Sequence, residues 1–150
     1  MARIFAYIAH KGGVVDDSAA EMIAAARAID ASAPLTAIVT GHGADLDVVC
    51  EGLRASYPEV WEISHEVLAY PNAEFIRKAL VKALPAESIV LLTHDHFGID
   101  LAPGLSIKTN AAFVSDVVAI EGVEGSQLKV VRQEFGGQVS ARVRCDISTG

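Results

Sequence analysis

The sequence predicts an α/β fold, a three-layer sandwich built on a mostly parallel, doubly wound sheet with antiparallel C-terminal strands. Two observations carry this prediction. Short apolar runs alternate with helix-forming segments as far as residue 110, and three extended segments without intervening helices follow. The length of 150 residues suits a single domain over residues 1–150, since such a chain buries roughly 70% of its unfolded surface.

Each expected parallel strand is a short apolar run bounded by polar or turn residues. Such runs cover residues 4–9, 35–40, 60–63 and 89–93. Their length and continuous apolar character are typical of strands that are buried on both faces. The sheet is therefore expected to carry helices on both sides.

The expected helices lie between and after these strands. Helix-forming residues with apolar side chains at helical spacing cover residues 18–29, 45–55, 73–84 and 100–110. The residues placed to cap these helices are Asp16 or Asp17, Asp45, Asn72 and Asp100. Pro103 then falls in the first turn of the fourth helix, where a proline is tolerated.

The last forty or so residues are expected to form antiparallel strands. The extended segments are residues 112–120, 127–135 and 139–147. Residues 121–126 have the composition of a hairpin turn, and Gly136-Gly137 marks a second reversal. Apolar and polar residues alternate along the last segment, which predicts one buried face and one face that is wet or covered by a partner.

Composition excludes several classes of function. The formal net charge is -7, and no cluster of Lys and Arg with interleaved aromatic residues offsets it, so nucleic acid is not expected as a partner. No apolar run is long enough to span a bilayer. Cys50 and Cys145 lie far apart, which predicts neither a zinc site nor a disulfide framework. We expect a cytoplasmic protein with no membrane insertion.

Loops at the carboxyl ends of parallel strands are where ligands bind in this fold class. The loop at Gly12-Gly13 lacks the GxGxxG spacing of a dinucleotide site, and a plain flexible loop is the favoured interpretation. The Gly41-His42-Gly43 loop allows close backbone approach, but Asp45 puts negative charge where a phosphate would sit. These loops leave a nucleotide-binding module open as an alternative.

Histidines follow several of the expected strands. His94 and His96 flank a carboxylate and suit zinc or iron, but loops at this edge of a sheet are commonly polar, so no metal site is predicted. There is no GxSxG nucleophile elbow, and catalysis by this chain alone has little support. Arginines on the last strands could instead grip a carboxylate or phosphate of a partner. These are Arg132, Arg142 and Arg144.

The most specific pattern runs from Gly98 through Asp100 and Pro103 to Ser115-Asp116. It resembles the "GxDLAPxL … SDV" signature of the electron transfer flavoprotein alpha subunit. Residues 131–144 are similar to the arginine-led strand, glycine turn and following strand of the same family. The resemblance covers nearly the whole chain and corresponds to the N-terminal domain of that subunit, whose fold is Rossmann-like and adenine nucleotide alpha hydrolase-like.

The resemblance implies a heterodimer of alpha and beta subunits that passes electrons from dehydrogenases through FAD. In that family FAD lies mainly in the C-terminal domain of the alpha subunit, whose "SRxxxD" and "QIGxTG" motifs this sequence lacks. FAD is therefore expected in the complete assembly and not on this chain alone. The chain is expected to be a scaffold that docks with a beta-type subunit and helps to cradle FAD, more an electron-carrier subunit than a catalyst.

The resemblance also implies roles for particular residues. Arg132, Gly136 and Gly137 would face FAD or the other subunit. The residues of the signature would form an interface or a structural motif, and they are Gly98, Asp100, Pro103, Ser115 and Asp116. Two alternatives remain: a nucleotide-binding module of the adenine nucleotide hydrolase-like class, and a metal-dependent enzyme that uses His94 and His96.

Overall fold

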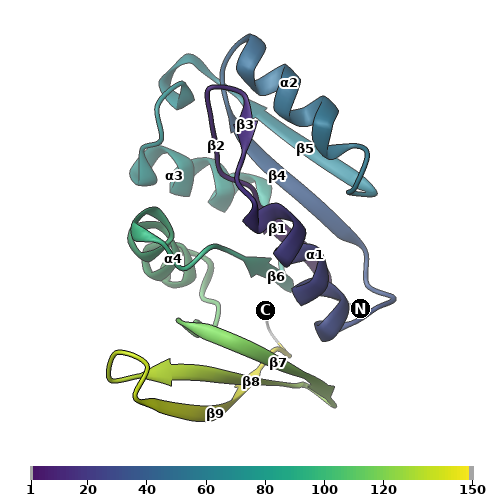
Figure 1. Cartoon of the computed structure of the whole chain (residues 1–150), viewed down its shortest axis with the longest axis vertical. Helices are drawn as coiled ribbons and strands as arrows, with labels where there is room; N and C mark the ends of the chain where they lie inside the picture. Colours follow the sequence, from purple (N-terminus) through teal and green to yellow (C-terminus); the bar gives the residue numbers. More distant parts are fainter. Residues whose placement is uncertain (1, 149–150) are drawn as a thin grey trace.

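A computed structural model describes residues 2–148, and a parallel sheet of four strands forms its centre (Figure 1). The strands are β1 (Arg3–Tyr7), β4 (Leu35–Gly41), β5 (Glu59–Ser64) and β6 (Ser88–Leu91). Their order across the sheet is β5-β4-β1-β6. All three pairings are parallel, and Ile4 at the centre lies opposite Leu35 on one side and Ile89 on the other.

In the described part of the chain, four α-helices and one short 3-10 helix cover the two faces of this sheet. On one face α1 (Ser18–Ile29) and α2 (Ala44–Leu53) pack against Ile4 and Ile8. On the other face α3 (Ala73–Ala83), α4 (His96–Thr109) and the short 3-10 helix η1 (Glu66–Leu68) pack against Phe5 and Tyr7. Side chains along β1 alternate between the two cores. The predicted α/β three-layer sandwich is confirmed.

The three C-terminal strands form a sheet of their own. They are β7 (Val117–Glu124), β8 (Gln127–Glu134) and β9 (Val139–Asp146), paired antiparallel in that order. They do not continue the parallel sheet, and β7 instead packs against α1 below the edge strand β6 (Figure 1). Ile120 and Leu128 from this small sheet pack against the core on the α1 side.

The loop after β1 is more ordered than the sequence suggests. His10–Lys11 (β2) and Val14–Val15 (β3) pair as a short antiparallel hairpin. Gly12 and Gly13, with φ of 57° and 75°, form its turn, which fits the positive φ that a tight two-residue hairpin requires at both central positions. The expectation of a plain flexible loop is corrected.

The start of α4 also differs from the prediction. The helix begins at His96, not at residue 100, because the Asp95 carboxylate accepts a hydrogen bond from the Gly98 N–H at 2.7 Å and caps it. Asp100 therefore lies inside the helix and caps nothing. Pro103 falls in the middle of α4, not in its first turn, so the carbonyl four residues earlier loses its helical donor.

Of the other predicted caps, the structure confirms Asn72 and corrects Asp45. Asn72 caps α3, and its side chain accepts hydrogen bonds from the two backbone N–H groups at positions 74 and 75. Asp17 occupies the N-cap of α1 without a side-chain bond, while the carboxylate of Asp16 accepts one from the Ser18 N–H. Asp45 does not cap α2, because Gly43 holds that position and Asp45 lies in the first turn.

Residues 111–116 form a linker instead of the start of a strand. The sequence predicts Ser115 and Asp116 within an extended segment over 112–120, but β7 starts only at Val117. Asp116 adopts a left-handed φ of 53°, and its carbonyl accepts a hydrogen bond from the Gln133 N–H at 3.0 Å. The linker is thereby pinned to β8, and it turns the chain out of the parallel sheet.

Candidate functional site

One edge of the parallel sheet opens onto a groove of about 910 Å³, which we call the β6 groove. Its walls are β6, α1, α4, the linker 111–116 and the inner face of the small sheet. Within the described residues β6 pairs only with β1, so its outer edge has no strand beside it. Its side chains are half-buried, whereas the apolar side chains of β1 are buried. The apolar run 89–93 predicted a buried strand but could not reveal this open edge.

A polar cluster lies at the carboxyl end of the groove. His94 follows β6, and its Nε2 lies 3.9 Å from Oδ1 of Asp116. The Ser115 hydroxyl accepts a hydrogen bond from the Arg132 guanidinium at 3.2 Å. The Nε of Arg132 is buried and makes no hydrogen bond among the described residues, and it lies 3.8 Å from Oε1 of Glu134. The structure thus joins Ser115, Asp116 and Arg132, which the sequence singled out separately, with His94.

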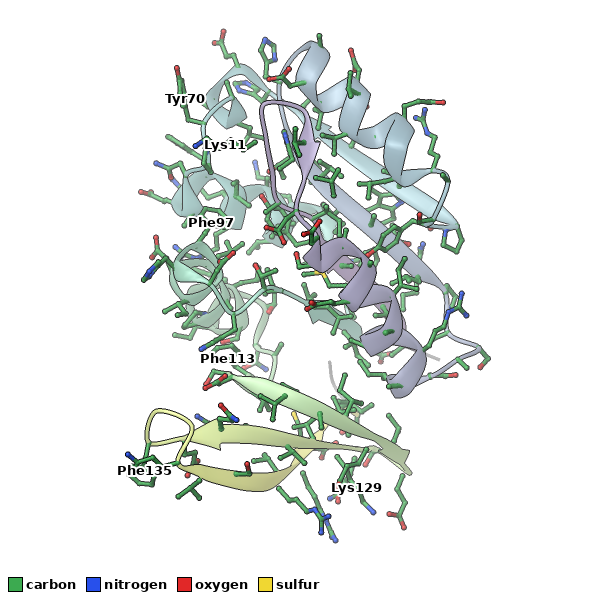
Figure 2. The ribbon with its side chains drawn as sticks, in the orientation of Figure 1. Lys11, Tyr70, Phe97, Phe113, Lys129 and Phe135 are labelled. Carbon is green, nitrogen blue, oxygen red and sulfur yellow. The ribbon has the colours of Figure 1, made fainter. Side chains whose placement is uncertain are left out.

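The turn between β8 and β9 forms an exposed tip, which we call the β8–β9 tip (residues 132–139). Gly136 and Gly137 have φ of 64° and 85° and make the turn, so they lie beyond the strand that carries Arg132. The Phe135 side chain is 75% exposed and projects from the end of the hairpin (Figure 2). Val139 on the neighbouring strand is 47% exposed. Sequence reasoning missed Phe135, although a large aromatic residue directly before a Gly-Gly turn was a usable signal.

The residues of the signature mostly shape the groove. Gly98, Pro103, Ser115 and Asp116 all line it. A Cβ at Gly98 would lie 1.8 Å from the Thr93 carbonyl oxygen, so only glycine lets α4 approach the end of β6 this closely. Asp100 is the exception. Its backbone carbonyl accepts a hydrogen bond from Arg77 of α3 at 2.7 Å, which ties the two helices together.

The loops at the carboxyl ends of β1 and β4 carry an imidazole and acidic side chains near the place where a phosphate would bind in this fold class. The Nε2–H of His10 donates to the Thr40 carbonyl at 2.8 Å, and the imidazole lies against Gly41. Asp45 and Asp47 occupy the first turn of α2. Their charge opposes a phosphate at the helix N-terminus, where the helix dipole would otherwise favour one.

A metal centre has no support from the geometry. Within residues 2–148, no group of three or more His, Cys, Asp or Glu side chains is placed to hold a metal ion. His96 is the first residue of α4, whereas His94 lies before the helix and pairs with Asp116. The two histidines therefore belong to different local structures.

The cysteines and the other arginines lie apart from the polar cluster. Cys50 is buried and Cys145 is half-buried in the wall of the groove, and burial raises the pKa of both thiols. In the register of β8 and β9, Arg132 lies opposite Ala141. Arg142 and Arg144 occupy the alternate positions of β9 and therefore face the other side of the sheet. The three arginines do not form a single row.

Comparison with known proteins gives one family. A family model described as "Electron transfer flavoprotein domain" matches residues 4–149. A search of curated proteins finds no significant match. The match confirms the family resemblance and does not distinguish an alpha from a beta subunit. No helix in the described part of the chain is long and apolar enough to cross a membrane.

Proposed function

We propose that this chain, which belongs to the electron transfer flavoprotein family, is an alpha-type domain that docks with a beta-type subunit and helps to cradle FAD. In the complete assembly FAD would carry electrons from dehydrogenases. The chain itself would act as an electron-carrier subunit in the cytoplasm, without chemistry of its own. The observation that carries the docking role is the exposed β8–β9 tip.

The tip has the composition of a protein interface. Aromatic residues and arginine are enriched among the residues that dominate binding energy, and a phenylalanine can bury about 150 Å² or more. Phe135 and Val139 offer exposed apolar surface there, and Arg132 lies on the adjoining strand. Gly136 and Gly137 carry no side chains, so a partner backbone or a flavin can approach closely. These features support the roles proposed for Arg132, Gly136 and Gly137.

The chain's own residues do not fit a complete FAD site. A pyrophosphate needs cations or a helix N-terminus, and no Lys or Arg is among the described residues that line the β6 groove. The first turn of α2 is acidic. The Arg132 guanidinium already pairs with Glu134 at 3.8 Å and donates to the Ser115 hydroxyl, so a contact to FAD or to the partner would add to these interactions. FAD is therefore assigned to the assembly, and most of its ligands to other parts of it.

Titration with a beta-type subunit tests the proposal. We expect a defined one-to-one complex by light scattering. Phe135→Ser should weaken binding about tenfold or more, since a central aromatic contact of the hot-spot kind is worth about 2 kcal/mol. The matched control is Tyr70→Ser, because Tyr70 is 82% exposed at a different end of the molecule and should leave affinity unchanged (Figure 2).

The outcomes separate the two parts of the proposal. Absence of any complex with the beta-type subunit would reject the docking role, and a complex indifferent to Phe135 would reject the tip as its site. Calorimetric titration with AMP and ATP addresses the nucleotide-binding alternative, for which appreciable heat is required. Metal content after purification tests the alternative of an enzyme that uses His94 and His96. That alternative fails if no metal remains above background.

A further inference from the structure

We infer that Phe135 is a pre-set anchor, which the β8–β9 tip holds in a left-handed backbone conformation so that its ring can enter an apolar pocket on the beta-type subunit. This inference rests on the proposed function and adds to it the conformation of the tip and the chemistry of the partner's pocket. It starts from the backbone of the turn. Phe135 has a φ of 52°, and Gly136 and Gly137 follow with φ of 64° and 85°.

The left-handed conformation is unfavourable for a phenylalanine. A Cβ crowds the following carbonyl there, so glycine adopts this conformation readily and, among the other residues, mainly asparagine and aspartate do. Asn110 and Asp116, which also have positive φ, are residues of this kind, and Glu87 is a polar residue in the turn before β6. Phe135 is bulky, and a bulky residue in this region is the kind of outlier that clusters at functional sites.

Packing inside this chain does not account for Phe135. The side chain is 75% exposed, and it belongs to neither of the two hydrophobic cores. An exposed ring gains little from burial, and the backbone that carries it is strained, so both properties oppose the stability of the isolated chain. An asparagine would suit the turn better. Contact with a partner accounts for both the ring and the strain.

Hydrogen bonds within the turn fix the tip before a partner arrives. The Gly137 N–H donates to the Glu134 carbonyl at 3.2 Å, and the Gln138 N–H donates to the Phe135 carbonyl at 3.3 Å. The strand pair closes the turn with Glu134 opposite Val139. A tip that is already ordered loses less conformational freedom on docking, which favours binding.

The surroundings of Phe135 specify the chemistry of the pocket. The charged residues on the adjoining strand, Arg132 and Glu134, already pair with each other at 3.8 Å. The turn after Phe135 is uncharged, and it consists of Gly136, Gly137 and Gln138. The partner therefore needs no charge to match the tip. The fitting partner surface is a concave apolar pocket that holds one aromatic ring, with neutral hydrogen-bonding groups at its rim.

Tryptophan fluorescence tests whether the ring enters such a pocket. Phe135→Trp keeps a large aromatic ring at the tip. Its emission should move to shorter wavelength and resist acrylamide quenching when the beta-type subunit binds. Tyr70→Trp is the matched control, because Tyr70 is 82% exposed at a different end of the molecule and its emission should not change (Figure 2). Signals from Trp61 and from the partner are common to both variants.

Two substitutions at residue 135 separate the ring from the backbone strain. Phe135→Asn removes both, so it should raise the Tm of the isolated chain by about 2–4 °C and weaken docking at least about tenfold. Phe135→Leu removes the ring but keeps a side chain that the left-handed conformation disfavours. It should therefore leave Tm unchanged and still weaken docking.

A matched pair of substitutions at Gly136 tests the pre-set backbone with the ring intact. A Cβ at Gly136 meets nothing within 4 Å, so neither Gly136→Ala nor Gly136→Asn introduces a clash at Cβ within the chain. Asparagine tolerates the φ of 64° and alanine does not. The Asn variant should therefore bind the beta-type subunit about two- to fivefold more tightly than the Ala variant.

The outcomes distinguish this inference from the proposed function. Absence of any complex would reject both. A complex in which the tryptophan of Phe135→Trp stays exposed would reject the anchor and leave the docking role in place. A Phe135→Asn chain no more stable than wild type would reject the strain, and equal binding of the two Gly136 variants would reject the pre-set backbone. An emission shift that requires added FAD would assign the ring to the flavin instead of a protein pocket.

Discussion

Replacing Gly98 by alanine should destabilise the protein, although alanine normally stabilises a helix. Gly98 lies in the first turn of α4, where it approaches the backbone of the preceding loop. Its Cβ position is 1.8 Å from the Thr93 carbonyl oxygen, while real Cβ contacts essentially never fall below 3.0 Å. The backbone must therefore move by at least 1.2 Å, the difference between these two distances.

The expected cost follows from two opposing contributions. Overpacking against backbone costs about 1–3 kcal/mol, and this site belongs at the upper end because a carbonyl cannot rotate away as a side chain can. Alanine regains about 1 kcal/mol of helix propensity. The net loss in the free energy of unfolding is about 2 kcal/mol. For a domain of this size, that lowers Tm by about 4–8 °C.

Urea denaturation with two glycine controls measures this effect. Gly52→Ala in α2 meets nothing within 4 Å and should stabilise by up to about 1 kcal/mol. Gly104→Ala would meet the Arg77 guanidinium at 2.4 Å, but that side chain can shift, so the change should stay within about 1 kcal/mol. A Gly98→Ala protein as stable as wild type would refute the close-approach argument.

Three further substitutions test the caps and the buried tyrosine. Asp95→Ala should cost about 1 kcal/mol in denaturation because it removes the cap of α4, whereas Asp100→Ala should cost less than about 0.5 kcal/mol; the reverse order would restore the sequence-based assignment. Tyr57 donates a buried hydrogen bond to the Ala19 carbonyl at 2.5 Å, and burial raises its pKa to about 12. Because the unfolded pKa is about 10, stability should fall as pH rises from 10 to 12, and Tyr57→Phe should flatten that fall; an unchanged slope would contradict it.

Local sequence patterns predict most elements of the fold because those elements are specified locally. The helix over residues 18–29 has the expected bounds, since helix formers fill it and acidic residues precede it. Val139–Asp146 is a strand whose side chains alternate as predicted, but the face that was predicted to be buried is only half-buried. Asn72 caps α3 because its side chain reaches the backbone two and three residues on.

The errors arise where two local signals compete. Asp95 and Asp100 are both possible caps, and Gly98 lowers the helix propensity between them, so the sequence favours the later start. The helix nevertheless starts earlier, because the Gly98 N–H donates a hydrogen bond to Asp95 and Gly98 closely approaches Thr93. That contact depends on where β6 ends, which the sequence of α4 does not contain.

The candidate site could be predicted only in pieces, because its contacts join distant segments. Arg132 reaches Ser115, seventeen residues earlier, and Asp116 lies beside His94. The resemblance singled out Ser115, Asp116 and Arg132 without indicating that they meet. The open edge of β6 is still harder to predict from the sequence. An apolar run indicates that a strand is buried, but it does not indicate which neighbouring element buries it.

The segment from Gly98 to Asp116 acts together as the frame of the groove. Gly98 sets α4 against the end of β6, and Asn110 ends the helix in a left-handed conformation with φ of 54°. The linker that follows forms one wall of the groove, and it is held in place because the Asp116 carbonyl accepts a hydrogen bond from β8. Because Gly98 sets this frame, Gly98→Ala should lower stability, whereas Asp100→Ala, which lies in the same segment but does not line the groove, should cost less than about 0.5 kcal/mol.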